Sequence, residues 1–330
     1  MQAQIPLIET KGQQTNFGPN FWNAKRAIDE LLKRQSLPVS TGTAALQLGC
    51  QVAFQRGTAV AVPDFTMVAT LHAVVAAGCK PIIVPCDPDS GMVNLKTLQE
   101  LAKWGGIQGA VIVSPFGATF DHTAYEALGI RLVYDLAGAF PMAPSTKWPV
   151  AYSCHATKNI STREGGFVTF ATCREFEEAR KLSCFSLDET RTATTIHAGN
   201  HKMDEARCQD LFCAVKYGME GIHARIRDKR RLARFYASSN ATPLVGLLDG
   251  FPSLCVMKVP DAQRLQDFGE MKGVTFKRYY HPLLSDMAFR EKVEIIAAPS
   301  PDLRRFIAFP SDATDEQALR VVEVVKEAFA

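Results

Sequence analysis

In the middle of the chain, short apolar runs alternate with stretches in which apolar residues recur at helical spacing. The apolar runs predict strands at residues 59–63, 81–85, 109–115 and 132–134. The stretches between them predict helices at residues 66–77, 95–104 and 123–128. Strands without polar alternation are typical of a parallel sheet that is covered on both faces. The pattern therefore predicts an α/β doubly wound core.

The pattern continues on both sides of this core and divides the chain into parts. Further helices are predicted at residues 22–34, 44–54, 174–182, 204–238, 261–272 and 315–328. Further strands are predicted at residues 150–154, 165–172, 253–258, 275–280 and 306–309. We therefore expect three parts. They are an N-terminal arm and helix at 1–36, a large domain at 37–205, and a long connecting helix with a small C-terminal α+β domain at 206–330.

The composition narrows the class of protein. The 330 residues are 47% hydrophobic and 22% charged, which is ample for a buried core. No apolar run is long enough to span a bilayer and the N-terminus lacks the pattern of a secretory signal, so we expect a cytoplasmic protein without a membrane partner. The net charge of +3 is too small to indicate a nucleic-acid partner. The nine cysteines include no C-x-x-C pair and the histidines show no metal-binding spacing, so we expect reduced thiols and no metal site.

A lysine and an aspartate stand where a sheet of this kind binds its ligands. Lys158 lies in the turn between the strands predicted at 150–154 and 165–172, and Asp135 follows the strand at 132–134. In open α/β sheets, ligands gather beyond the carboxyl ends of the strands. A lysine that forms a Schiff base with pyridoxal phosphate, and an aspartate that pairs with the ring nitrogen, are the usual arrangement for that cofactor. An aspartate at the end of a strand could also cap the next segment, but the presence of Lys158 favours the chemical interpretation.

The turn before the helix at 44–54 is a candidate phosphate site. It reads Ser40-Thr41-Gly42-Thr43, and the start of a helix presents unpaired backbone N–H groups to an anion. The alternative is ordinary capping of the helix by a threonine hydroxyl, which is common. The motif alone does not decide between these two interpretations.

Several short motifs follow one another along nearly the whole chain. They are residues 40–46, 62–70, 135–139, 153–158, 164–166, 200–205, 279–283 and 307–310. Together they resemble the DegT/DnrJ/EryC1/StrS family of sugar aminotransferases. The resemblance implies pyridoxal phosphate as cofactor and the type I aminotransferase fold, with a mixed, mostly parallel sheet in a large domain and a smaller C-terminal α+β domain. The sequence around Lys158 most closely resembles that of the branch that aminates nucleotide-linked 4-keto- or 3-keto-6-deoxy sugars.

The resemblance also implies roles for individual residues around the cofactor ring. Lys158 would carry the Schiff base with the cofactor, and Asp135 would pair with the pyridine nitrogen. Met67 stands where many members have an aromatic residue that stacks on the ring. A methionine is polarizable and can cover a ring face, but it cannot stack flat.

A second group of residues would hold the cofactor phosphate. The backbone amides of Gly42 and Thr43 and the side chain of Ser153 would bind it within one subunit. Asn200 would reach the same phosphate from the other subunit. The resemblance therefore implies a homodimer with shared active sites.

The implied activity is transfer of an amino group from L-glutamate to a keto group of a nucleotide-linked 6-deoxy sugar, with dTDP as the expected nucleotide. Such a step would serve the biosynthesis of a glycoside or of a surface polysaccharide such as a lipopolysaccharide O antigen. A nucleotide diphosphate needs cations, and the candidates are Lys202, Arg225, Arg227, Lys277 and Arg278. Tyr280 and His281 are candidates for contact with the sugar.

Two other functions fit the same motifs. One is a pyridoxal-phosphate aminotransferase for a ketone without a nucleotide, such as a cyclitol. The other is a non-catalytic regulator that keeps the fold and binds the cofactor without turnover. Retention of both Asp135 and Lys158 argues against the regulator.

Overall fold

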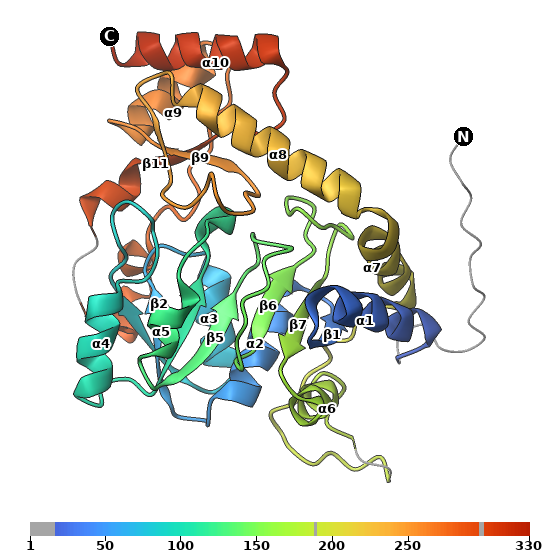
Figure 1. The fold of residues 1–330 in the computed structure, drawn as a ribbon. Helices are drawn as coiled ribbons and strands as arrows, with labels where there is room; N and C mark the ends of the chain where they lie inside the picture. Colours follow the sequence, from blue (N-terminus) through green and yellow to red (C-terminus); the bar gives the residue numbers. More distant parts are fainter. Residues whose placement is uncertain (1–16, 188–189, 297–299) are drawn as a thin grey trace.

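The computed structural model describes residues 17–187, 190–296 and 300–330, and Figure 1 shows its layers. In this part of the chain an eight-stranded sheet has the order β1-β7-β6-β5-β4-β2-β3-β10. β7 runs antiparallel to both of its neighbours, whereas the pairs from β6 to β10 are parallel. The strands are β1 (Gln35–Val39), β2 (Ala59–Pro63), β3 (Lys80–Val84), β4 (Gly109–Val113), β5 (Arg131–Asp135), β6 (Val150–Ser153), β7 (Gly166–Phe170) and β10 (Glu294–Ile295). This mixed, mostly parallel sheet confirms the predicted α/β class.

Helices pack on this sheet, and local sequence sets where several of them begin. The Thr41 hydroxyl caps α2, and a capping box of Thr172 and Glu175 begins α6. The helices of this layer are α1 (Pro19–Leu32), α2 (Gly42–Ala53), α3 (Val68–Ala76), α4 (Leu95–Lys103), α5 (His122–Glu126), α6 (Cys173–Leu182) and α7 (Glu205–Tyr217). Short 3-10 turns lie at Pro115–Gly117, Leu284–Asp286 and Arg290–Lys292.

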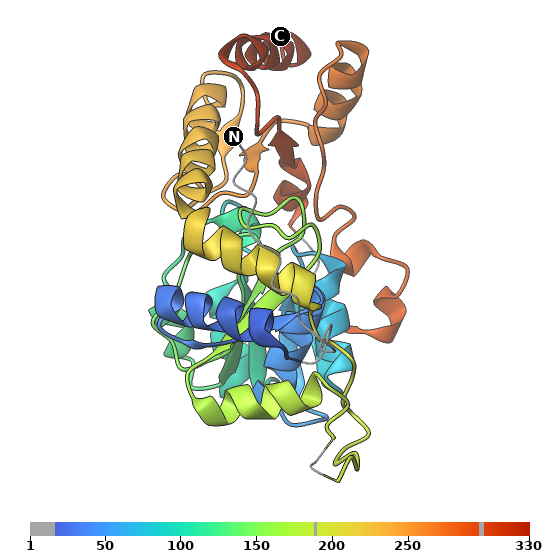
Figure 2. The same ribbon diagram turned by 90° about the vertical axis from the view of Figure 1, so that its right-hand side faces the viewer.

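A smaller layer lies beyond α8 (Met219–Tyr236), which leads to it from the large sheet (Figure 1). Its sheet has the order β11-β9-β8 with antiparallel pairing. The elements are β8 (Thr242–Pro243), β9 (Cys255–Lys258), α9 (Ala262–Met271), a 3-10 turn at Pro301–Arg305, β11 (Phe306–Phe309) and α10 (Asp315–Ala328). In both views α9 and α10 lie at the end of the molecule opposite α6 (Figures 1 and 2).

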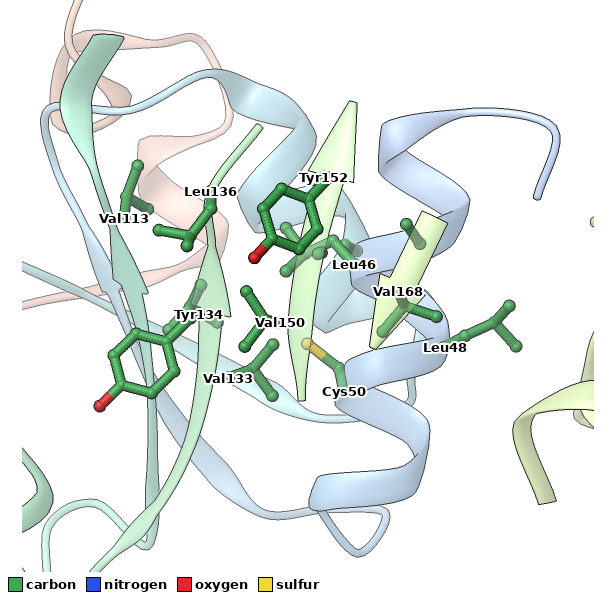
Figure 3. Packing of buried hydrophobic residues seen from close by; sticks show 14 of the residues in the cluster. Leu46, Leu48, Cys50, Val113, Val133, Tyr134, Leu136, Val150, Tyr152 and Val168 are labelled. Atoms are coloured by element: carbon green, nitrogen blue, oxygen red, sulfur yellow. The ribbon is translucent and has the colours of Figure 1, made fainter. Parts of the chain in front are cut away.

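Each layer has its own buried hydrophobic cluster. In the large cluster the side chain of Cys50 on α2 points toward Val133 of β5 and Val150 of β6 (Figure 3). Tyr152 of β6 stacks on Phe167 of β7 with the ring centroids 4.7 Å apart. Burying one aliphatic side chain of this kind contributes about 1.5–3 kcal/mol. The second cluster joins α8, α9 and α10 to the small sheet. The packing of α2 on the strands fixes the position of its N-terminal end beside β6.

One segment of the C-terminal part returns to the large sheet. β10 pairs with β3, and Leu284 lies in the large hydrophobic cluster with Ile295 packed against it. Nearby, the buried carboxylate of Asp64, just after β2, accepts hydrogen bonds from the backbone N–H and the hydroxyl of Ser285 at 2.8 and 2.9 Å. The predicted domain boundary between residues 205 and 206 stays a prediction, and the chain crosses between the two layers more than once.

Two predicted elements are wrong. The helix predicted at 204–238 is two helices, because Gly218 ends α7 and begins α8. Glycine is a poor helix former, and the break lets α7 pack along α1 while α8 turns toward the small layer (Figure 1). The strand predicted at 275–280 is reduced to a single bridge between Lys277 and Ala308. An extended strand cannot include Tyr280, because this residue has a φ of 55°, outside the extended region.

Two kinds of feature are absent from the described residues. None of these helices combines the length and the apolar character that a membrane span requires. Nor does any group of three or more His, Cys, Asp and Glu side chains in the same ranges have the arrangement of a metal site.

Candidate active site

Asp135 ends β5 at the carboxyl edge of the sheet and is 8% exposed. Its Oδ2 accepts a hydrogen bond from the Thr70 hydroxyl of α3 at 3.0 Å, and its Oδ1 accepts one from the backbone N–H of Ala137 at 3.1 Å. Burial raises the pKa of this carboxyl group, and the two hydrogen bonds and the charge of Lys158 oppose that rise. A buried carboxylate in this setting is stabilised when a positively charged group lies against it.

Lys158 lies in the loop between β6 and β7, close enough to Asp135 for each charge to affect the other. Burial lowers the pKa of Lys158, and the charge of Asp135 opposes this effect. A lowered pKa leaves more of the amine unprotonated, which is the form that attacks a carbonyl. The structure therefore brings together the two side chains that the sequence singled out.

The N-terminal end of α2 lies directly against the end of β6. A Cβ atom on Gly42 would lie 2.7 Å from the Cβ of Ser153, and one on Gly166 would lie 2.7 Å from the backbone nitrogen of Gly42. Only glycine permits such an approach. Thr41 caps the helix through its side chain, whereas the N–H groups of Gly42 and Thr43 have no acceptor among the described residues. The turn thus caps the helix and also leaves two backbone N–H donors available beside the Ser153 hydroxyl.

Aromatic side chains form a wall near the carboxylate. Tyr280 stacks on Phe116 with the ring centroids 4.5 Å apart, and it meets Phe65 edge-on at 5.2 Å. Burial raises the pKa of the Tyr280 hydroxyl, and the charge of Asp135 raises it further, so the two groups are neighbours. The segment after Tyr280 is held to the large sheet by the hydrogen bonds of Ser285 described above.

These groups fit pyridoxal phosphate. Asp135 offers a buried negative charge for the ring nitrogen, and Lys158 offers an amine for the aldehyde. The start of α2 offers hydrogen-bond donors for the phosphate. Met67 directly precedes α3 and is 57% exposed, so its thioether is available to cover a ring face.

Most of the residues predicted to contact the partner subunit or the nucleotide are exposed to solvent. Asn200 is exposed, and its Oδ1 accepts a hydrogen bond from Lys202 Nζ at 2.5 Å. The Lys202 amine also lies over the ring of Phe185, 4.7 Å from its centroid. Arg225 donates from Nη2 to the backbone oxygen of Asn159 at 3.0 Å, which ties this cation to the Lys158 loop.

The last predicted contacts lie on α8 and near Tyr280. Arg227 is exposed on α8. His281 is also exposed, and its Nδ1 lies 3.0 Å from Nη2 of Arg278. Lys277 is exposed and pairs through its backbone with β11. Among these, His281 and Arg278 form the cluster that adjoins the aromatic wall.

The sequence did not reveal two residues that the structure places beside Asp135 and Lys158. Thr70 bonds Asp135, and Asn159 lies buried next to Lys158. For Thr70 a signal existed, because it is a polar residue on the apolar face of the predicted helix at 66–77. For Asn159 the sequence offered none, because its partners are remote along the chain.

Known proteins resemble this chain in sequence and in fold. A model of the DegT/DnrJ/EryC1/StrS aminotransferase family matches residues 2–326. The dTDP-4-amino-4,6-dideoxy-D-glucose transaminase of Shigella dysenteriae is 24% identical over 309 residues, which cover 87% of this chain and 83% of that protein. Among solved structures, a putative PLP-dependent aminotransferase from Bacillus cereus superposes with a TM-score of 0.84 at 18% identity, over 96% of this chain and 93% of that one. DesV of S. venezuelae, solved with a ketimine intermediate, gives a TM-score of 0.82 at 20% identity, over 96% and 90%.

These matches confirm the resemblance that the motifs indicated. They also confirm the aminotransferase fold, the aminotransferase class of enzyme and pyridoxal phosphate as the cofactor of that class.

Proposed function

Because the chain belongs to the DegT/DnrJ/EryC1/StrS aminotransferase family, we propose that it moves an amino group from L-glutamate to a keto group of a nucleotide-linked 6-deoxy sugar. The observation that carries this proposal is the buried Asp135 with the half-buried Lys158 near it, at the carboxyl edge of the sheet. Shielding two such charges from water is costly, and a protein that had only kept the fold would gain nothing from it.

In the proposed reaction each residue of the site has a defined role. Lys158 would hold the cofactor through its amine and, as a free amine, would move the proton at the α-carbon of the amino donor. Asp135 keeps the ring nitrogen in its protonated, positive form. Bound pyridoxal phosphate supplies the electron sink that makes this proton removable. The N–H groups of Gly42 and Thr43 and the Ser153 hydroxyl bind the phosphate and keep the reacting atoms aligned.

The acceptor is proposed to be a 4-keto or 3-keto sugar linked to dTDP. The Shigella dysenteriae relative, named for a dTDP-amino sugar, supports this choice. Tyr280 and His281 are the proposed sugar contacts, and Arg278, 3.0 Å from the His281 ring, is the proposed partner of the diphosphate. Lys202, Arg225, Arg227 and Lys277 complete the set of candidate cations. The amino sugar would enter a glycoside or a surface polysaccharide.

We also propose a cytoplasmic homodimer in which Asn200 of one copy reaches the phosphate site of the other. Asn200 is exposed, and the segment between α6 and α7 that leads to it carries three exposed apolar side chains. These are Phe185 (47%), Leu187 (43%) and Ile196 (92% exposed). Several exposed apolar side chains on one segment support a surface that a partner covers. All nine cysteines are free, as a reducing compartment requires.

The test compares Lys158→Ala with Lys258→Ala. Lys258 forms ion pairs with Asp89 and Asp302 but belongs to the small layer. In the wild type, L-glutamate should bleach the visible absorption of the bound cofactor, and a dTDP-linked keto sugar should restore it. Lys158→Ala should lose turnover by roughly 1000-fold or more. Lys258→Ala should behave as the wild type.

Three results would overturn the proposal in different ways. Turnover by Lys158→Ala would reject the role of this amine. Restoration by a cyclitol ketone and by no sugar nucleotide would replace the substrate class. A cofactor spectrum that no amino donor changes would identify a non-catalytic regulator.

A further inference from the structure

A buried asparagine in the loop between β6 and β7 makes four hydrogen bonds to remote parts of the chain. Asn159 is 1% exposed. Its Nδ2 donates to the backbone oxygens of Phe140 at 3.2 Å and Phe251 at 2.8 Å. Its Oδ1 accepts from Nζ of Lys229 at 3.2 Å, and its backbone oxygen accepts from Nη2 of Arg225 at 3.0 Å. Both amide hydrogens and the amide oxygen are therefore in use.

The four partners come from two sides of the active site. Phe140 follows Asp135 in the same connection between β5 and β6. Phe251 precedes β9, and Arg225 and Lys229 lie on α8, which leads to the small layer. Asn159 thus joins the Lys158 loop to the segment that carries Asp135 and, on the other side, to the C-terminal part of the chain.

Only a side-chain amide satisfies this set of partners. Two carbonyl oxygens need donors, and an ammonium group needs an acceptor. An aspartate would place an oxygen against two carbonyl oxygens, and an apolar residue would leave buried polar groups unpaired. Lys229 is itself 6% exposed, and Asn159 Oδ1 is the acceptor that the described residues provide for its amine. Burial lowers the pKa of Lys229, and the charge of Asp312 opposes this.

We propose that Asn159 is a positioning residue that sets the place of Lys158 relative to Asp135, and that Lys229 and Arg225 hold it there. The proposal rests on the proposed function, because it needs a reactive Lys158. Adjacent Cα atoms are about 3.8 Å apart, so a residue fixed by four hydrogen bonds leaves its neighbour little freedom. A misplacement of about 1 Å at a reacting group can cost roughly 100-fold in rate.

The test uses three variants of the full chain loaded with pyridoxal phosphate. Asn159→Asp disrupts the bonds to both carbonyls, and Arg225→Ala removes one bond from an exposed side chain. Asn94→Ala is the matched control, because Asn94 is also an asparagine that fixes backbone, as the cap of α4. The readouts are the melting temperature, the kcat and KM of the L-glutamate half-reaction, and the pH midpoint of the visible cofactor absorption, which reports the protonation of the linked Lys158 nitrogen.

Asn159→Asp should lower kcat of the half-reaction about 100-fold while KM changes less than about threefold. The midpoint should move by at least about half a pH unit, since the distance from the Lys158 nitrogen to the charge of Asp135 changes. Arg225→Ala should change both readouts in the same direction, with a loss of about tenfold. Asn94→Ala should lower the melting temperature and leave the midpoint and kcat unchanged.

An Asn159→Asp protein that folds with an unchanged midpoint and kcat would overturn the proposal. If this variant fails to fold, Arg225→Ala decides, and an unchanged midpoint in that variant overturns the proposal as well. A defect of Arg225→Ala confined to the KM for a sugar nucleotide would assign this arginine to the substrate and would equally contradict the positioning role. Failure of the proposed function is separate, because it appears as turnover by Lys158→Ala.

Discussion

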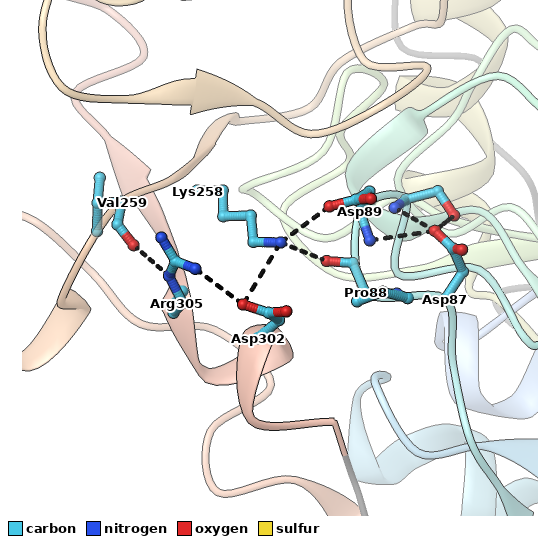
Figure 4. A network of polar contacts seen from close by, with 8 residues as sticks. Asp87, Pro88, Asp89, Lys258, Val259, Asp302 and Arg305 are labelled. Atoms are coloured by element: carbon cyan, nitrogen blue, oxygen red, sulfur yellow. Dashed lines mark hydrogen bonds and ion pairs between the residues drawn. The ribbon is translucent and has the colours of Figure 1, made fainter.

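Two lysine–aspartate pairs in this molecule have different surroundings. Lys158 is half-buried and lies near the buried Asp135, and burial lowers the pKa of the lysine and raises that of the aspartate. Lys258 of β9 lies instead between the two layers, 2.8 Å from Asp89 and 3.6 Å from Asp302 (Figure 4). The same pair of residue types thus lies away from water in one place and has solvent-exposed carboxylates in the other.

The contacts of Lys258 show how a lysine–aspartate pair is arranged when its carboxylates are exposed to solvent. Its amine also donates to the backbone oxygen of Pro88 at 3.1 Å, and Arg305 donates to Asp302 at 2.8 Å (Figure 4). The carboxylates of Asp89 and Asp302 are 65% and 42% exposed. Solvent and salt screen such pairs, so they attach the two layers weakly. Burial, more than the identity of the partners, distinguishes Lys158 and Asp135 from this network and supports the proposed chemical role of the two residues.

Removing the charge of Asp135 should have the largest effect. Asp135→Asn keeps the shape of the side chain but leaves the ring nitrogen of the cofactor without its negative partner. We expect kcat of the L-glutamate half-reaction to fall about 100–1000-fold, as when a preorganised electrostatic contact is lost. Single-turnover absorbance measures this rate. Asp89→Asn is the control and should keep the wild-type rate; comparable losses in both variants would contradict the contrast between the two regions.

Another carboxylate, that of Glu205, separates the effect of burial from the effect of a lysine partner. Glu205 is 5% exposed and accepts hydrogen bonds from the backbone N–H groups of Gly18 and Asn20, both at 2.8 Å, at the start of α1. Glu205→Gln would set an amide against these donors, and we expect a loss of about 1–3 kcal/mol in the free energy of unfolding, measured with urea. The rate per folded molecule should not change. A loss of activity without a loss of stability would show that α1 matters to the chemistry.

The hydroxyl of Thr70 offers a finer test of Asp135. It stabilises the charged carboxylate, so Thr70→Val should move the titration of Asp135 to higher pH. Carbon-13 NMR of labelled aspartate in the cofactor-free protein measures this midpoint. Loss of one hydrogen bond to a charged group should also lower kcat about tenfold. A midpoint that stays in place or moves to lower pH would show that Thr70 does not support the charge.

The smallest effect is expected at the exposed network. Lys258→Ala removes the contacts to Asp89, Pro88 and Asp302, and the free energy of unfolding should fall by only about 1 kcal/mol or less. The difference from the wild type should shrink further in high salt. A loss of several kcal/mol, or a change in the pH profile of activity, would mean that water does not screen this region as its exposure indicates.

The elements that the sequence predicts well are those with a sustained pattern of their own. β2, β11 and α10 have the predicted bounds, because an apolar run or a helical stripe with a capping threonine defines both ends. The two-residue strands β8 and β10 could not be predicted, since two residues show no periodicity and their pairing depends on strands far away in the chain.

The same distinction holds in the site. Asp135 and Lys158 stand out in the sequence, because each is a charged residue placed just beyond an apolar strand. Asn159 does not, since its function depends on carbonyl groups of Phe140 and Phe251 and on an amine of α8. The residues that we propose do the chemistry could be predicted from the sequence, whereas the residue that we propose positions them could be found only in the packed structure.

The central claim is that one amine, that of Lys158, holds the cofactor covalently. Borohydride reduction of the protein loaded with pyridoxal phosphate, followed by mass spectrometry of its peptides, tests this directly. The account predicts a single modified lysine, on the peptide that contains Lys158, and the same experiment on Lys258→Ala should give the same peptide. Modification of another lysine while Lys158 stays unmodified would contradict the account.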